Sequence, residues 1–69
     1  PHYGTVNISV PSGASSQHVQ IVVSDDNGSR VVYDRSQAGG DNISKSVSGT
    51  GKTRVKVYIN NSLVQDQYI

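Results

Sequence analysis

The 69-residue sequence contains no cysteine, tryptophan, phenylalanine, methionine or glutamate. Without cysteine the chain has neither a disulfide framework nor a thiolate metal site, and its two histidines cannot complete a closed structural zinc site. A chain of this length buries only about 60% of the surface that its unfolded form exposes, so it forms at most one domain with a small core. That core has to come from valine, isoleucine, leucine and tyrosine, which suit a pleated sheet.

Long apolar runs and a strong charge of one sign are also absent. No stretch approaches the roughly 18 apolar residues of a membrane-spanning helix, and no signal-peptide pattern is present. Six Lys and Arg residues against five acidic residues give a formal net charge of +1, which is too balanced to favour nucleic-acid binding. Because the sequence starts with Pro1 rather than methionine, we expect a single domain, 1–69, excised from a larger protein.

What the chain does contain is alternation of apolar and polar residues. In the clearest segment, Val55, Val57 and Ile59 alternate with polar neighbours, and no segment repeats apolar residues with the spacing of an amphipathic helix. The alternation predicts strands at 3–10, 18–24, 30–34, 42–48, 52–59 and 62–69. About six or seven short antiparallel strands predict an all-β fold, a small immunoglobulin-like β-sandwich. A partly open barrel of about five strands is the alternative.

Turn residues separate these strands. Pro11 and Gly13 predict a turn at 11–16, and Asn27-Gly28 predicts a hairpin at 25–29. The longest irregular stretch, 36–41, is predicted to cross between two sheets. Asparagine tolerates left-handed backbone angles, so Asn60-Asn61 is predicted to form a two-residue turn. An unbroken ladder across that turn would place Val57 opposite Val64 and Thr53 opposite Tyr68, with an outward face formed by Arg54, Lys56, Gln65 and Gln67.

The segment 46–53 looks like the end of a phosphate-binding loop, because Gly51-Lys52-Thr53 matches the last three positions of that motif. The first glycine of the motif would fall at Ser46, however. The motif also needs a following helix whose N-terminal amides contact the phosphates. Residues 54–59 read as a strand instead, so we interpret the two glycines as a β-turn and expect no nucleotide.

Two further candidate sites lack the residues that their chemistry needs. Asp25, Asp26 and Asn27 resemble the start of a calcium loop, but the later oxygen ligands and the closing glutamate are missing, so a polar hairpin tip is the better interpretation. His18 and Asp34 could be combined with one of many serines. Such a set has no positioned base and no oxyanion donors. We expect no catalytic residue, no cofactor and no metal ion.

A basic stripe is the remaining candidate binding site. Arg54, Lys56 and Tyr58 share the outward face of the strand 52–59, Lys52 precedes them, and Lys45 is expected to approach on a neighbouring strand. Such a stripe could bind a phosphate-rich or carboxylate-rich polymer. The simpler interpretation, which we favour, is a solvated face that keeps the sheet soluble and its edges unpaired.

The order of these features resembles a known family. The resemblance rests on the segments VQIVVSDD (19–26), VVY (31–33), a Gly40-Asp41 loop, VSGTG (47–51) and VKVYINNSLV (55–64). They are similar to the C-terminal immunoglobulin-like domain that follows the PASTA repeats in PrkC-type, membrane-anchored serine/threonine kinases of Gram-positive bacteria. The resemblance covers nearly the whole chain, from about residue 18 to the end.

The resemblance implies a location and partners. The parent protein would have a cytoplasmic kinase domain, one membrane helix and extracellular PASTA repeats that sense peptidoglycan fragments. This chain would be the outermost, non-catalytic domain, which acts as a spacer or contacts peptidoglycan or anionic wall polymers weakly. It contains none of the family's kinase motifs. The alternative function is a carbohydrate-binding or adhesion module of a secreted hydrolase or surface protein, against which the absence of tryptophan and the presence of only four tyrosines argue.

Overall fold

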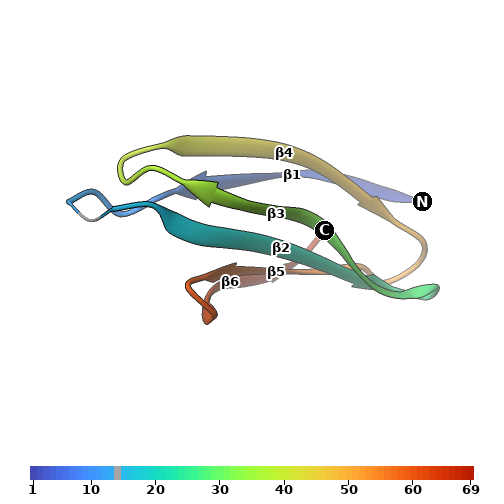
Figure 1. The fold of residues 1–69 in the computed structure, drawn as a ribbon. Coiled ribbons are helices and arrows are strands. Elements are labelled where there is room, and N and C mark those ends of the chain that lie inside the picture. Colours follow the sequence, from blue (N-terminus) through green and yellow to red (C-terminus); the bar gives the residue numbers. More distant parts are fainter. Residues whose placement is uncertain (14) are drawn as a thin grey trace.

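The computed structural model describes residues 1–13 and 15–69. The strands are β1 (His2–Ser9), β2 (Gln17–Asp25), β3 (Gly28–Gln37), β4 (Asn42–Gly49), β5 (Arg54–Ile59) and β6 (Ser62–Tyr68). They form two antiparallel sheets, one of β1 and β4 and the other in the order β3-β2-β5-β6 (Figure 1). The all-β prediction is therefore confirmed.

The connections follow the Greek-key arrangement of an immunoglobulin-like sandwich. Hairpins join β2 to β3 and β5 to β6, whereas the chain changes sheet between β1 and β2, between β3 and β4, and between β4 and β5. This order corresponds to strands B and E facing strands C′, C, F and G of immunoglobulin-like domains. Because the described strands divide into two separate sheets, the barrel alternative is wrong.

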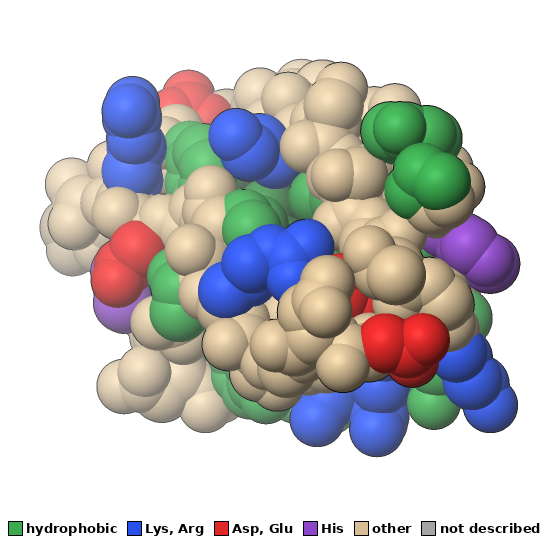
Figure 2. Space-filling model, turned by 90° about the vertical axis from the view of Figure 1, so that its right-hand side faces the viewer, with side chains coloured by type: hydrophobic (Ala, Val, Ile, Leu, Met, Phe, Trp, Pro, Cys, Tyr) green, Lys and Arg blue, Asp and Glu red, His purple; other side chains and the backbone are tan. Residues whose placement is uncertain are grey.

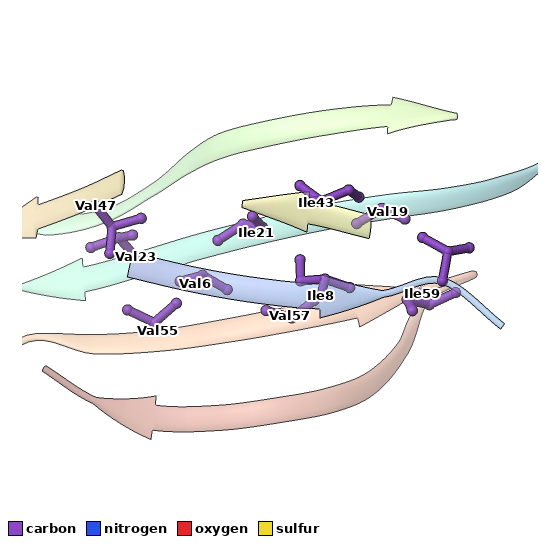
Figure 3. Close-up of a cluster of buried hydrophobic side chains, with 11 residues drawn as sticks. Val6, Ile8, Val19, Ile21, Val23, Ile43, Val47, Val55, Val57 and Ile59 are labelled. Atoms are coloured by element: carbon purple, nitrogen blue, oxygen red, sulfur yellow. The ribbon is translucent and has the colours of Figure 1, made fainter. Parts of the chain in front are cut away.

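The core lies between the sheets and contains eleven apolar side chains, most of which occupy every second position of their strands (Figure 3). The two central strands of the larger sheet, β2 and β5, supply its most deeply buried members, including Ile21 and Val57, which have no exposed surface. The weakest predicted strand, 42–48, is present as β4 and contributes Ile43 and Val47. The core is thus a single layer of mainly β-branched residues, as the composition predicts.

The smaller sheet covers the edge strands of the larger sheet only in part: no residue of β3 or β6 is fully buried, although Val32 and Tyr33 of β3 pack against the core. On β6, the inner positions opposite Val57 and Val55 carry Gln65 and Gln67. The Gln65 amide Nε2 donates a hydrogen bond to the main-chain oxygen of Asn7 in β1, at 2.9 Å. Polar amides, which can form hydrogen bonds with water or with the main chain, therefore occupy these inner positions that no further described strand covers.

The β5–β6 ladder differs from the predicted one. Asn60 and Asn61 form the predicted turn with φ angles of 51° and 67°. A β-bulge then shifts the register between Val57 and Tyr58, so that Val57 faces Gln65 rather than Val64. A shift of one residue exchanges the two faces of a strand. The predicted outward position of Gln65 and Gln67 is therefore wrong.

Other boundaries move by a few residues. β3 continues to Gln37, so the predicted crossing loop shortens to 38–41, and it does connect the two sheets. β5 begins at Arg54 rather than at 52, because Thr53 is fully buried in the preceding turn. The hairpin at 25–29 is confirmed, with positive φ at Gly28. The predicted turn at 11–16 includes residue 14, which lies outside the described residues.

Candidate functional site

The predicted basic stripe lies on the outer face of the larger sheet. Arg54, Lys56 and Tyr58 alternate with buried residues along β5 and therefore point away from the core. The register places Tyr68, Asp66 and Leu63 of β6 opposite them. We use the name β5–β6 face for these side chains and their neighbour on the preceding turn: Lys52, Arg54, Lys56, Tyr58, Leu63, Asp66 and Tyr68.

Lys45 is not part of this face. It lies on β4, opposite Val6 of β1, and β4 belongs to the other sheet. The expectation that Lys45 approaches on a strand next to β5 is therefore wrong. The physical reason is the Greek-key crossing, which takes the chain to the smaller sheet after β3 and brings it back only at β5.

Asp66 holds Arg54 in place. The guanidinium donates one hydrogen bond from Nε to Oδ1 of Asp66 at 2.7 Å, and a second from Nη2 to Oδ2. This bidentate contact lowers the pKa of the Asp66 carboxyl below its usual value and raises the pKa of Arg54. Sequence reasoning missed Asp66, because only the bulge moves it to the same side as Arg54.

Tyr68 is the most exposed aromatic side chain of the β5–β6 face, with 56% of its surface accessible. The Lys52 ammonium lies 4.9 Å from the ring centroid and the Arg54 guanidinium carbon lies 5.9 Å from it. Cations at such distances are attracted by the electron-rich face of the ring. The β5–β6 face thus combines three cations, one carboxylate and two tyrosines on an open sheet.

Exposed aliphatic side chains lie on this face and elsewhere on the larger sheet. Leu63 and Val64 on β6 are each 49% exposed, and Val31 on β3 is 52% exposed. Lys52 and Lys56 form no ion pair with any described residue. The described residues also enclose no pocket, so a ligand would meet this part of the chain on an open surface.

The hairpin tip at 25–29 is organised by the Asp25 carboxylate, whose side chain is only 1% exposed. Its Oδ2 accepts a hydrogen bond from the Thr50 amide at 2.8 Å and lies 3.2 Å from Nη1 of Arg30, while Oδ1 accepts one from the Asn27 amide at 2.9 Å. These contacts, the Thr50 bond first, lower the pKa of Asp25. The carboxylate thus joins the hairpin to the β4–β5 turn, in agreement with the interpretation as a hairpin tip.

The segment that looks like a phosphate-binding loop is that turn. Gly51 has a φ of 72°, and a β-carbon there would overlap the carboxylate of Asp26. Strand β5 follows instead of a helix; Gly51 lies in the bend between β4 and β5, whereas Gly49 is the last residue of β4, so the interpretation of both glycines as one β-turn is right only for Gly51. Figure 2 looks onto this end of the sandwich, where Lys and Arg side chains gather along the lower edge and others lie among acidic and uncharged side chains.

No helix among residues 1–13 and 15–69 is long and apolar enough to cross a membrane. No protein-family model, curated protein or solved structure matches the chain.

Proposed function

We propose that this chain is a non-catalytic extracellular module at the distal end of a membrane-anchored serine/threonine kinase. Its β5–β6 face would make a weak contact with anionic wall polymers, and the rest of the sandwich would act as a spacer next to PASTA repeats. Two features support this proposal. The strand and turn segments resemble the immunoglobulin-like domain of PrkC-type kinases, and the sandwich fold is the one that the resemblance implies.

The single observation that carries the binding part is the composition of the β5–β6 face. Lys52, Arg54 and Lys56 oppose one carboxylate, Asp66, so the face carries an excess of two positive charges (three minus one). Tyr68 beside the cations and the exposed Leu63 add contact area. A polyanion with phosphate groups along its chain would meet several of these cations at once, and its binding would be weak and sensitive to salt.

The test is an NMR titration of the ¹⁵N-labelled chain with poly(glycerol phosphate) and, separately, with a muropeptide. Binding of the polyanion should shift amide signals of 52–58 and 63–68, and the shifts should shrink strongly when the salt concentration is raised. Lys56→Ala should weaken the titration, whereas Lys45→Ala, which removes the same charge from the other sheet, should not. Absence of shifts in these segments would leave only the spacer function.

The kinase context has a separate test in the full-length gene. PASTA repeats encoded before Pro1 would support the proposed parent protein. A catalytic hydrolase domain in that position would instead favour a module that anchors a secreted enzyme to a carbohydrate.

A further inference from the structure

The outer face of the smaller sheet is formed by eight side chains that are all uncharged and non-aliphatic. They face each other in four cross-strand pairs: Tyr3–Ser48, Thr5–Ser46, Asn7–Ser44 and Ser9–Asn42. All eight are exposed, whereas Val6, Ile8, Ile43 and Val47, with which they alternate, are buried. We call this surface the hydroxyl–amide face.

Most of its hydrogen-bonding groups are free to bind a ligand. Among the described residues, the only side-chain hydrogen bond on this face joins the Ser9 hydroxyl to Oδ1 of Asn42, at 3.2 Å. A hydroxyl can donate one hydrogen bond and accept two, and an amide side chain can both donate and accept. Two parallel rows of such groups therefore lie about 5 Å apart, in steps of about 7 Å along each strand.

The absence of charge restricts the kind of ligand. A polyanion would gain no Coulomb attraction here, in contrast to the β5–β6 face with Arg54 and Lys56. An apolar partner would bury eight polar groups without hydrogen bonds, which is costly. A neutral ligand rich in hydroxyl groups avoids both penalties, because its own donors and acceptors replace those of the water that it displaces.

Tyr3 gives this surface an aromatic platform. It is 77% exposed and ends the row of outward residues on β1. A tyrosine ring offers a large rigid contact area at a small cost in side-chain entropy, and serine and asparagine offer adaptable hydrogen bonds, which is the composition of many antibody binding sites. The four cross-strand pairs span about 20 Å along the strands, a length that suits an oligosaccharide of several sugar units.

We propose that the hydroxyl–amide face binds an uncharged polysaccharide, with Tyr3 stacking on one sugar ring and the rows of hydroxyl and amide groups bonding to the sugar hydroxyls. This site is separate from the β5–β6 face, because the two surfaces lie on the outer sides of different sheets. A domain with both surfaces could contact a charged and a neutral wall polymer at the same time.

The test is a titration of the ¹⁵N-labelled chain with a neutral β-1,4-linked N-acetylglucosamine hexamer. Amide signals of 3–9 and 42–48 should shift, at any salt concentration, since no ion pair forms. Tyr3→Ala should weaken binding about three- to tenfold through loss of the ring contact. Tyr68→Ala, which removes an exposed tyrosine from the other sheet, should leave it unchanged.

A second variant tests the polar rows without touching the core. Thr5→Val keeps the shape of an outward side chain and removes its hydroxyl, so it should weaken binding while the amide spectrum of the folded protein is retained. Shifts on 52–68 instead, equal effects of the two tyrosine variants, or no shift at about 10 mM hexamer would overturn the proposal. Signals of 3–9 that move with protein concentration alone would also overturn it, since they would indicate contact between two copies. The polyanion titration is independent, so either site can fail without the other.

Discussion

Single residues at the end of the sandwich determine how the loops pack. Gly51 combines a positive φ with direct contact to the Asp26 carboxylate, so two separate effects exclude a side chain there. Gly28 has a positive φ of 108° as well, but a β-carbon at that position would meet no atom within 4 Å. A comparison of substitutions at the two glycines therefore distinguishes the cost of backbone strain from the cost of steric overlap.

We expect Gly51→Ala to destabilise the protein more than Gly28→Ala. The second substitution carries only the cost of a left-handed backbone for a residue with a side chain, about 1 kcal/mol. The first adds the displacement of the Asp26 carboxylate, the end of an exposed and flexible side chain, for a total of about 1–2 kcal/mol. Urea unfolding of both variants measures the difference. Equal losses would show that Asp26 moves away freely and that the contact contributes nothing.

Asp25 should make the stability depend on pH. Its pKa is lowered in the folded protein, first by the Thr50 amide, so its ionised form is stabilised by folding. That contribution is present above the unfolded pKa of about 4 and is lost as the pH falls through the lower folded value. We expect Asp25→Asn to lower the urea midpoint of unfolding at pH 7. Near pH 2 the urea midpoint of the variant should approach that of the parent chain. A difference in urea midpoint that stays constant between pH 7 and pH 2 would contradict the stabilising role of the ionised Asp25 carboxylate.

At the level of elements, alternation and turn residues were enough to predict the strands. Val19, Ile21 and Val23 recur with a period of two and define one face of β2, although Val22 on the other face is also apolar, and Asn60-Asn61 favours a tight turn. The bulge after that turn has no such signal, since it depends on how β6 packs beside β1. The crossing to the other sheet before β4 was predicted, but the return of the chain to the larger sheet at β5, which separates β4 from β5, was not, because it depends on the whole topology. Asp66 was therefore missed, and Lys45 was wrongly expected next to β5.

The Arg54–Asp66 pair limits the positive charge of the β5–β6 face. Asp66→Asn removes the carboxylate and frees Arg54, so we expect affinity for poly(glycerol phosphate) to rise about two- to threefold at low salt. Asp34→Asn is the matched control, because it makes the same change in net charge on β3, two strands away from β5. Titrations at two salt concentrations measure both variants. A similar rise for Asp34→Asn would mean that net charge alone, and not this face, attracts the polymer.

The free energy of unfolding of the whole molecule is expected to be small. Two sheets enclose one layer of eleven apolar side chains, and the sequence has no cysteine with which to cross-link them by a disulfide. At about 0.05–0.15 kcal/mol per residue, a chain of this length is stable by about 3–10 kcal/mol. A single large cavity in the core can remove most of that amount.

Ile21 is the position where this should be most visible. It is fully buried at the centre of β2, between β3 and β5, and ranks first by volume among the side chains without exposed surface. Ile21→Ala removes three carbon atoms from the core and should cost about 2–5 kcal/mol, which is a large part of the stability of the chain. Val31→Ala on the adjacent β3 removes an aliphatic side chain that is 52% exposed, and it should change stability by less than about 0.5 kcal/mol. Circular dichroism during urea unfolding compares the two variants. If Ile21→Ala unfolds at nearly the same urea concentration as the parent chain, the two sheets do not depend on this shared core, and the stability must come from the ladders within each sheet.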